Sequence, residues 1–368
     1  MSKTTFSSDT SIFTDKLASY KQLIDSDIDA FVQKLERETL QHYGAYARLA
    51  IDAYGSILQR GGKRIRGSLA MVAYEMAGGK NRVLSLQLAR VLEMLHAYIL
   101  IVDDFQDRSH VRRGGPAAHT LLAQYHSRHE LAGDSEHFGA SIAMNAALAG
   151  NHLAQQAIAE MDVSSEVKLK ISSMINGTMV TTDHGQTSDI INEVVADVPM
   201  QDIENVLEWK TAHYTFLNPL TAGLALAGAD QEAPEKIHAY AMHAGKAFQI
   251  TDDILGTFGS EFESGKSPMD DIREGKRTLI IAHALEHTGN GNKNFLVRML
   301  GNESITPVEF ERCKDILVES GALEYAQQQS KTHVDAALEA LLNPPTSWNS
   351  DGVDFLRRLA QQLLGRTK

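Results

Sequence analysis

The chain has 368 residues, of which 43% are hydrophobic and 22% are charged, and its formal net charge at pH 7 is −12. This composition is that of a globular protein with enough apolar residues for a sizeable core. A negative net charge argues against a general nucleic-acid binder, because attraction to a phosphate backbone needs a positive field. We therefore expect no nucleic acid among its partners.

The single cysteine, Cys313, excludes an intrachain disulfide framework and a zinc site built from several cysteines. One cysteine also fits a reducing compartment. Residues 1–15 are polar and contain acids, unlike a signal peptide. No run of about 18 uncharged apolar residues occurs, as a membrane-spanning helix would need. We therefore expect a cytoplasmic protein with no membrane span.

Helices are predicted over almost the whole chain. After a loosely ordered lead over residues 1–20, the segments are rich in Ala, Leu, Met, Gln and Glu, and the first proline is Pro116. Apolar residues recur at helical spacing, as in Leu88, Leu92 and Leu95. The Asn-Gly and Asp-Gly steps do not lie between alternating strand-like runs, so no β-hairpin is expected. We predict an all-α fold in which residues 21–368 form a single domain.

The first segment with chemical meaning is Gly-Gly-Lys-Arg-Ile-Arg-Gly at residues 61–67. Paired glycines let a backbone approach a ligand closely, and Lys63, Arg64 and Arg66 could grip an anion. The order of glycine and lysine fits neither a Walker loop nor a Rossmann fingerprint. Taken alone, the segment is equally well explained as a solvated basic turn.

An acidic pentad, Asp-Asp-Phe-Gln-Asp, occupies residues 103–107 at the end of an apolar series. On a helix, Asp103 and Asp107 lie one turn apart on the same face, where two carboxylates repel each other by about a few tenths of a kcal/mol. A hard cation removes that repulsion, and a set of oxygen ligands without histidine or cysteine suits Mg²⁺. A lone pentad of this kind is more often an acidic helix end that faces water.

Arginines follow the acids, and this makes a merely solvent-exposed acidic helix end a weaker interpretation. Arg112 and Arg113 precede Gly114, Gly115 and Pro116. Guanidinium groups are forked, permanently charged donors that match phosphate oxygens, and the glycines and proline favour a tight turn that could present them. Acids for a metal followed by bases for phosphate indicate a diphosphate site. A salt-bridged surface turn is the alternative.

A second acidic pair, Asp252 and Asp253, lies inside an apolar helical stretch, where unpaired charge is costly. Two basic residues, Lys266 and Lys276, follow it in a segment that contains several glycines. The order of acid and then base therefore occurs twice in the chain, which makes coincidence a poor explanation.

Together these segments resemble the polyprenyl synthetase family, the trans-type isoprenyl diphosphate synthases, from about Gly61 to Arg277. Further matching elements are Leu95-His96, Gly115-Pro116 with His119, Gly185-Gln186 with Asp189, Lys210-Thr211 and Phe248-Gln249. The resemblance implies an isoprenoid-synthase-type bundle of many helices around a central cavity, and a homodimer. It also implies an enzyme that joins isopentenyl diphosphate to an allylic diphosphate and releases diphosphate.

The resemblance assigns roles to particular residues. It implies Mg²⁺ ions held by the two acidic motifs, at Asp103, Asp104, Asp107, Asp252 and Asp253. It implies an allylic diphosphate site formed by Arg112, Lys210, Lys266 and Lys276. It implies an isopentenyl diphosphate site formed by Lys63, Arg66, His96 and Arg113. Thr211 and Gln249 would offer oxygen dipoles to the allylic cation, and the departing diphosphate would take the proton.

One departure from the family pattern concerns the second acidic motif, which ends in Gly256 where many members have a third aspartate. The variant is similar to that of some bacterial geranylgeranyl diphosphate synthases. Tyr98, five residues before the first motif, resembles the aromatic residue of members that make short products. Helix geometry places Ile99 more nearly in line with Asp103, so both residues are expected to limit chain length. We predict a C20 product, geranylgeranyl diphosphate, with the C15 farnesyl diphosphate as the alternative.

Three other functions fit parts of the sequence. A terpenoid cyclase would share the acidic pentad, but it would not need the basic segment at residues 61–67. A non-catalytic regulatory subunit would keep the fold, but it should have lost one acidic motif. A di-iron helical bundle could use Glu93 with His96 and Glu235 with His238, since such sites repeat the Glu-x-x-His spacing. That hypothesis gives the aspartate motifs no role.

Overall fold

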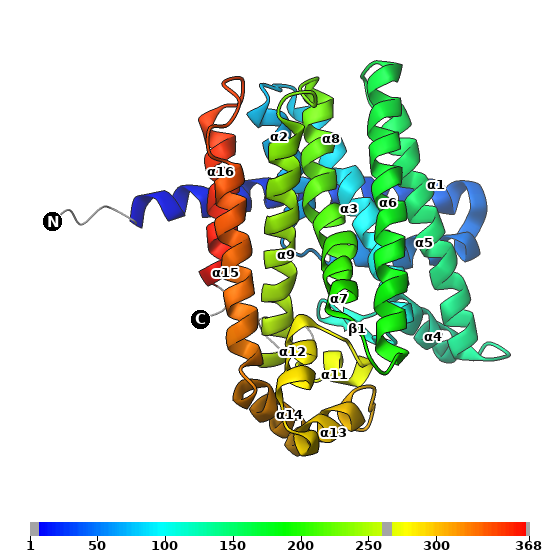
Figure 1. The fold of residues 1–368 in the computed structure, drawn as a ribbon. Coiled ribbons are helices and arrows are strands. Elements are labelled where there is room, and N and C mark those ends of the chain that lie inside the picture. The colour runs from blue at the N-terminus through cyan, green and yellow to red at the C-terminus, as the bar shows by residue number, and fades with distance from the viewer. Residues whose placement is uncertain (1–6, 260–266, 366–368) are drawn as a thin grey trace. The chain divides into compact units, whose positions relative to one another are not determined.

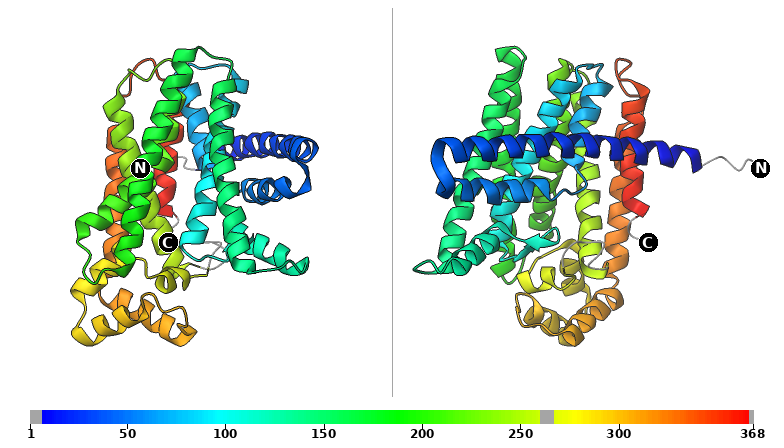
Figure 2. Two further views of the ribbon diagram at one scale, coloured as in Figure 1. Left: turned by 90° about the vertical axis from the view of Figure 1, so that its right-hand side faces the viewer. Right: turned by 180° about the vertical axis from the view of Figure 1, so that it is seen from behind.

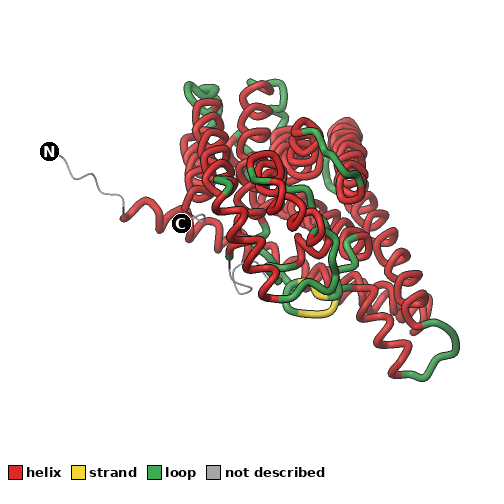
Figure 3. The backbone as a smooth tube through the Cα atoms, turned by 60° about the horizontal axis from the view of Figure 1, so that its bottom comes forward, coloured by secondary structure: helices red, strands yellow, loops and turns green. Residues whose placement is uncertain are grey.

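The computed structural model describes residues 7–259 and 267–365, and in these ranges helices form nearly all of the regular structure (Figure 3). The all-α prediction is therefore confirmed. Between them, the described segments contain one small sheet, an antiparallel hairpin of β1 (Val111–Arg112) and β2 (Gly115–Pro116). The expectation of no hairpin was wrong here, because four residues paired across a two-residue turn are too few to leave an alternating pattern.

The chain divides into two compact units, one of residues 7–172 and 222–228 and the other of residues 173–221 and 229–365 within the described parts. The single domain expected over residues 21–368 stays a prediction. Figure 1 labels most elements of the two units.

The first unit is built on five helices and the hairpin. The helices are α1 (Ser7–Gln59), α2 (Ile65–Met76), α3 (Arg82–Gln106), α4 (Ala118–Arg128) and α5 (Ser135–Glu160). It also contains the start of α6 (Ser165–Val194) and the end of α8 (Asn218–Ala227).

Helix α1 is broken at Gly44, whose φ of 83° is a left-handed value that glycine adopts at no steric cost. The chain doubles back there, so that α1 forms two antiparallel arms (Figure 2). In the first arm, residues 7–20 are helical and Phe13 and Tyr20 are buried. The Tyr20 hydroxyl also donates to Glu75, at 2.5 Å. Residues 7–20 therefore belong to a packed helix, although their composition is polar.

Helix α3 forms the core of the first unit and packs against α1, α2 and α5. Its neighbour α5 presents small buried residues, and a Cβ added at Gly150 would lie 2.2 Å from the ring of Tyr54. By length and composition α3 could cross a membrane, and it is the one helix of the described ranges that could. Its apolar window is 61% buried inside the protein, as expected for a core helix.

The second unit contains α7 (Met200–Val206), η1 (Leu207–Leu217), α9 (Pro234–Phe258), α11 (Asp270–Glu274), α12 (Leu279–His287), α13 (Asn290–Met299), α14 (Pro307–Glu319), α15 (Ala322–Ala340) and α16 (Ser350–Gly365). Helix α9 packs along α15 and η1 (Figure 1). Apolar side chains of α9, α12 and α14, such as Ile254, Ile280 and Ile316, meet in one buried cluster. This packing fixes the position of α9, which carries Asp252 and Asp253.

Candidate active site

The basic segment of the first unit forms a tight turn between α1 and α2. Gly61 and Gly62 have φ values of 78° and 124°, which favour glycine, and Arg64 has a φ of 50°. A Cβ at Gly62 would lie 2.9 Å from the guanidinium carbon of Arg113. Glycine at this position therefore lets the Arg113 side chain lie directly on the backbone of the turn.

The hairpin aims Arg113 at this turn. Its two central residues, Arg113 and Gly114, have φ values of 52° and 72°, as a type I′ turn requires. The Arg113 guanidinium donates a very short hydrogen bond to the Gly61 carbonyl oxygen. The sequence from Arg112 to Pro116 thus forms the tight turn that its glycines and proline predicted, although in hairpin form.

His96 of α3 lies between two arginines. Its Nε2 atom is 3.2 Å from Nη1 of Arg66 and 3.1 Å from Nη2 of Arg113. Because guanidinium groups only donate, Nε2 is assigned as the acceptor. Burial, and then the charges of Arg66, Arg113, Arg112 and Arg64, lower the pKa of His96 well below its ordinary value. The imidazole is therefore neutral at pH 7 and adds no charge to the arginine pair.

Positive charge is concentrated around Arg113. Burial lowers the pKa of Arg113 to about 10, and the charges of Arg64, Arg112 and Arg66 act in the same direction while Glu93 opposes them. Guanidinium groups that crowd one another in this way are stabilised by an anion. Three residues predicted to bind isopentenyl diphosphate, Arg66, His96 and Arg113, are therefore brought together. The fourth, Lys63, lies exposed in the same turn.

Arg64 has a different task from the one expected, since its side chain is only 1% exposed. It forms ion pairs with Glu93 at 3.2 Å and with Asp25 at 2.8 Å, and donates to the Leu58 carbonyl oxygen at 2.8 Å. The expectation that Arg64 helps to grip an anion was therefore wrong. Glu93 also accepts from the Gly67 amide at 3.0 Å. These bonds occupy the glutamate that a di-iron site would need.

The acidic pentad occupies the C-terminal end of α3, with Asp107 as the C-cap residue. The carboxyl end of a helix carries partial negative charge, so three carboxylates there make the local electrostatic potential strongly negative. Asp103 and Asp107 are half-buried, whereas the Asp104 side chain is fully buried. The exposed edge of this cluster is thus formed by the two residues predicted to share one helix face.

Arg112 binds this end of α3. Its Nε donates to Asp104 at 2.6 Å, and its Nη2 lies 3.3 Å from Asp103. Burial alone would lower the pKa of Arg112, but the carboxylates of Asp104, Asp103 and Asp107 outweigh it and raise that pKa. The guanidinium is therefore firmly charged and is held against the acidic motif.

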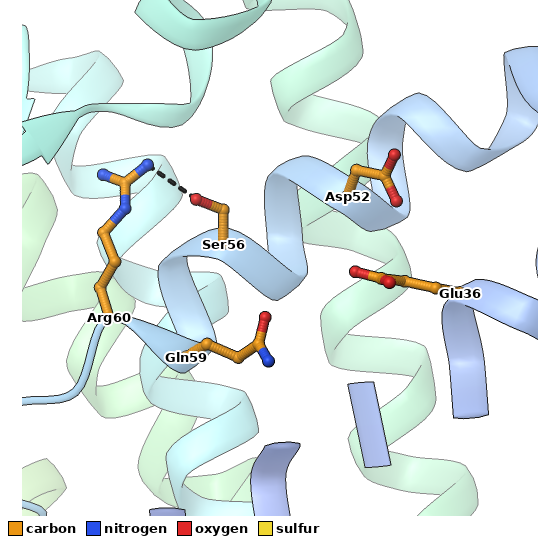
Figure 4. A pocket seen from close by; sticks show the side chains of 5 residues that line it. All are labelled: Glu36, Asp52, Ser56, Gln59 and Arg60. Atoms are coloured by element: carbon orange, nitrogen blue, oxygen red, sulfur yellow. Dashed lines mark hydrogen bonds between the residues drawn. The ribbon is translucent and has the colours of Figure 1, made fainter. Parts of the chain in front are cut away.

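Arg60, which follows α1, was missed by the sequence analysis. Its Nη1 donates to the carbonyl oxygens of Arg112 at 3.2 Å and Pro116 at 2.6 Å, and its Nη2 donates to Ser56 at 2.7 Å. Figure 4 shows this last bond beside a surface pocket that Glu36, Asp52, Ser56, Gln59 and Arg60 line. Arg60 therefore anchors the hairpin that presents Arg112 and Arg113. No motif in the sequence separates this arginine from an ordinary basic residue.

In the second unit, Lys210 and Thr211 lie on η1, an 11-residue π-helix. π-Helical segments are rare and frequently occur at functional sites. Glycines allow its close packing: a Cβ at Gly185 would lie 2.5 Å from the Lys210 amide nitrogen, and one at Gly245 would lie 2.4 Å from the Ala212 Cα. Helices α6 and α9 thus fix the backbone on which both side chains are mounted.

Two lysines predicted to bind the allylic diphosphate meet at one carboxylate. Lys210 is 2.8 Å and Lys276 is 3.3 Å from the same oxygen of Asp189, and Lys276 is also 2.7 Å from Glu193. Burial would raise the pKa of Asp189, but the two lysines outweigh it and lower that pKa. Asp189 therefore holds both ammonium groups in one place. Lys266, the third predicted lysine, lies outside the described residues.

A chain of hydrogen bonds joins η1 to the second acidic motif. Thr211 donates to Gln249 at 2.7 Å, and Gln249 donates to Asp253 at 2.7 Å. Burial, and then the carboxylate of Asp271, raise the pKa of Asp253 well above its ordinary value, and Asp252 acts in the same direction. Asp253 is therefore protonated more readily than an ordinary aspartate. Asp252 itself is half-buried.

Tyr98 and Ile99 are both half-buried on α3, between His96 and the acidic pentad. Their predicted role in chain length stays a prediction. Across the described residues, no three side chains of His, Cys, Asp or Glu gather as a ready metal site. Asp103, Asp107 and Asp252 are half-buried acids. Their role as metal ligands stays a prediction.

The fold is all-α, and charged clusters in each unit gather acidic and basic side chains. A model of the polyprenyl synthetase family matches residues 48–317, so the chain belongs to that family. The predicted family is therefore confirmed.

Related proteins agree with this assignment. The chain is 31% identical over 315 residues to a geranylfarnesyl diphosphate synthase of Aeropyrum pernix, covering 85% of this chain and 92% of that protein. It is 31% identical over 317 residues to a geranylgeranyl diphosphate synthase of Saccharolobus solfataricus, covering 86% and 90%. The solved geranylgeranyl pyrophosphate synthase of Corynebacterium glutamicum, complexed with isoprenyl diphosphate and magnesium, aligns with a TM-score of 0.85 at 28% identity, covering 99% of this chain and 100% of that chain.

Proposed function

We propose that this protein is a Mg²⁺-dependent prenyltransferase that condenses isopentenyl diphosphate with dimethylallyl, geranyl or farnesyl diphosphate. The observation that carries the proposal is the convergence of Arg66 and Arg113 on a neutral His96, which forms a half-buried cationic site suited to one diphosphate. Lys210 and Lys276, gathered at Asp189, supply a second group of cations. Two cationic groups suit a reaction between two diphosphate esters.

The proposed chemistry begins with ionisation of the allylic diphosphate at its C–O bond. The double bond of isopentenyl diphosphate then attacks the allylic cation, and the departing diphosphate takes the proton that is lost. Charge separation is the difficult step, so preorganised charges that stabilise the leaving group should supply most of the catalysis. Arg112, Lys210 and Lys276 are oriented for this task by carboxylates that already hold them.

Mg²⁺, when bound, would act as a Lewis acid that neutralises charge on the departing diphosphate. We propose Asp103 and Asp107 of the first unit, and Asp252 of the second, as ligands of Mg²⁺ ions, because each is a half-buried acid. Asp104 and Asp253 are better suited to positioning, since the first holds Arg112 and the second accepts from Gln249. Thr211 and Gln249 carry oxygen atoms that can stabilise the cation.

We propose geranylgeranyl diphosphate as the product. Tyr98 and Ile99 lie just before the acidic pentad on α3, where bulky side chains would stop a growing tail, and the Saccharolobus relative is named for this product. Farnesyl diphosphate is the shorter alternative. The Aeropyrum relative is named for a product one isoprene unit longer, so relatives of equal identity differ in chain length.

A non-catalytic regulatory subunit is the second candidate function. Against it stand the two acidic motifs, since Asp103 and Asp107 of the first and Asp252 of the second are half-buried acids, and Arg112 lies 3.3 Å from Asp103. We also propose a homodimer, supported by family membership and by the exposed Met144 and Leu148, one turn apart on α5. A cytoplasmic location is proposed on the strength of the single, buried Cys313.

The test is to incubate the pure protein with Mg²⁺, isopentenyl diphosphate and each allylic starter in turn, then to separate the dephosphorylated products by chain length. We expect a C20 alcohol as the main product. A C15 alcohol would select the farnesyl alternative. No product from any starter would support the regulatory subunit.

A further inference from the structure

The C-terminal half of α12 carries two histidines, His283 and His287, which lie four residues apart on one face of the helix. Their rings stack, with centroids 4.0 Å apart and planes inclined by 9°. The same spacing lets the H-E-x-x-H helix of metalloproteases bind zinc through both imidazoles. Neither histidine has a part in the proposed reaction.

A hydrogen bond and ring stacking hold the two imidazoles in place. The His287 Nδ1 atom is 2.9 Å from the His283 carbonyl oxygen, so Nδ1 is assigned as the protonated donor and Nε2 keeps its lone pair. Metal-binding histidines commonly donate their other ring nitrogen in this way. Tyr325 of α15, a helix that packs against α12 (Figure 1), stacks on the His283 ring with centroids 4.3 Å apart. The pair is therefore oriented before any ligand binds.

The surroundings of the pair favour a cation bound to neutral imidazoles. Burial, and then the charge of His287, lower the pKa of His283, while Glu286 opposes them. The Nδ1 atom of His283 is buried and has no hydrogen-bond partner among the described residues, so the fold leaves binding capacity on this ring unused. Burial, and then the charges of Glu204 and Glu286, raise the pKa of Tyr325. Negative charge, to which the carboxyl end of α12 contributes, therefore surrounds the ring stack.

We propose that His283 and His287 bind a divalent transition-metal ion of the zinc type, at a site that is separate from the acids proposed for Mg²⁺. Imidazole nitrogens suit Zn²⁺, Cu²⁺ and Ni²⁺, whereas Mg²⁺ prefers oxygen ligands. In the part of the chain that the structure describes, no third side chain of His, Cys, Asp or Glu joins the pair, so water would complete the shell. Such a site is open, unlike a structural zinc site with four protein ligands. A metal ion held there would stabilise the folded protein, because it binds the folded state.

The test is a titration of the full chain, purified without a histidine tag, with Zn²⁺ in competition with a fluorescent chelator. Excess Mg²⁺ is present throughout so that sites built from oxygen ligands are occupied. The variants are His287→Gln and His283→Gln, and the matched control is His152→Gln, an exposed histidine of α5. A melting curve with and without Zn²⁺ accompanies each titration. No diphosphate substrate is added, so the result does not depend on the proposed function.

His287→Gln is expected to weaken Zn²⁺ binding by at least about tenfold, since even residues that only support a metal site cost about 10–100-fold in affinity when they are lost. It should also remove the rise in melting temperature that Zn²⁺ causes in the wild type. His283→Gln should have the same effects, and His152→Gln should behave as the wild type.

Because His287 is exposed, its replacement should leave the melting temperature in the absence of Zn²⁺ unchanged, and a loss of binding then reports on the site rather than on the fold. Equal Zn²⁺ affinity in the wild type and His287→Gln would overturn the proposal. A loss in His152→Gln as large as that in His287→Gln would overturn it as well.

Discussion

Asp103 and Asp104 are neighbours in the chain, yet their surroundings give them different tasks. The Asp104 carboxylate is fully buried against Arg112, whereas Asp103 is 16% exposed and lies 3.3 Å from the same arginine. An acid that must bind a metal ion has to reach solvent and substrate. At the residue scale, burial therefore separates a proposed metal ligand from the acid that positions its neighbour.

Asp103→Ala is expected to reduce the rate of condensation by about 10²–10³ or more, the typical cost of losing a preorganised group that stabilises charge. The fold should change little, because Asp103 lies at the end of α3. Steady-state rates and a melting curve measure the two effects. The control is the exposed Asp162→Ala, and near-normal activity in Asp103→Ala would refute the metal assignment.

Substitutions of the basic residues in the turn between α1 and α2 should affect ligand binding at some positions and stability at another. Lys63→Ala and Arg66→Ala are expected to raise the KM for isopentenyl diphosphate while the affinity for the allylic diphosphate stays largely intact. Arg64→Ala should instead lower the free energy of unfolding by about 3–5 kcal/mol, since it leaves the buried Glu93 without its ion-pair partner. Titration of both ligands, with denaturant unfolding, compares the variants. Equal losses for both ligands in Arg66→Ala would contradict separate sites.

His333 should make stability depend on pH. Its Nδ1 lies 3.0 Å from that of His243, and burial, with the charges of His243 and Lys246, lowers the pKa of His333 to about 4. Because the unfolded pKa is about 6.5, the unfolded state binds this proton first as the pH falls. The stability that the neutral ring contributes is therefore complete above pH 6.5 and is lost between about 6.5 and 4.

The test is the melting temperature of the wild type and of His333→Gln across this range. The wild type should lose its advantage over the variant as the solution is acidified from pH 7 to pH 5. The control is His152→Gln, an exposed histidine of α5, which should follow the wild-type curve. A parallel decline in the wild type and His333→Gln would show that His333 does not titrate in this range.

At the scale of elements, η1 is the feature that most directly links packing to chemistry. Its π-helical backbone carries Lys210 and Thr211, and glycines of α6 and α9 lie against it where no side chain fits. Close packing against these glycines thus fixes the backbone of Lys210 and Thr211, two proposed site residues. A small change in this packing should reach the chemistry.

Gly245→Ala tests this link. The new Cβ would lie 2.4 Å from the Ala212 Cα, so η1 must shift, and we expect a loss of about 1–3 kcal/mol in stability together with a lower kcat. The matched control is Gly177→Ala on α6, where nothing lies within 4 Å of the added Cβ. That variant should gain about 0.5–1 kcal/mol and keep its activity. Unchanged kcat in Gly245→Ala would mean that η1 does not position the site.

Helix α3 is expected to set product length through Tyr98. The preceding turn, with Leu95 and Met94, lies about 5.4 Å further along the axis, which is close to the length of one isoprene unit. Tyr98→Ala should therefore yield products beyond C20 with a smaller change in overall rate. If Tyr98 only packs against a neighbour, its loss should cost about 3–5 kcal/mol in stability and leave product length unchanged. Chromatography of dephosphorylated products beside a melting curve separates the two outcomes.

At the scale of the whole molecule, a net charge of −12 coexists with a cluster of half-buried arginines around His96. The negative net charge argued against nucleic acid as a partner. It does not determine the local electrostatic field at His96, where several arginines lie close together. Local charge, set by which side chains the fold brings together, decides the ligand. This is why motif order was more informative than composition.

The helices and the charged motifs could be predicted from the sequence, because both are local patterns. The difference between Arg64 and Arg66 could not, since it depends on Glu93 and Asp25, which only the fold brings to Arg64. The role of Arg60 and the stacking of Tyr325 on His283 have the same origin. The sequence therefore indicates which kinds of side chain are candidates for the site, whereas tertiary contacts decide which of these side chains are occupied elsewhere in the fold.

The most direct test of the central claim is the incorporation of radiolabelled isopentenyl diphosphate into an acid-labile prenyl product by the pure protein. We expect incorporation with at least one allylic starter in the presence of Mg²⁺, its loss when EDTA removes the metal, and its return when Mg²⁺ is added back. No incorporation with dimethylallyl, geranyl or farnesyl diphosphate, or an equal rate with and without EDTA, would show that the protein is not a Mg²⁺-dependent prenyltransferase.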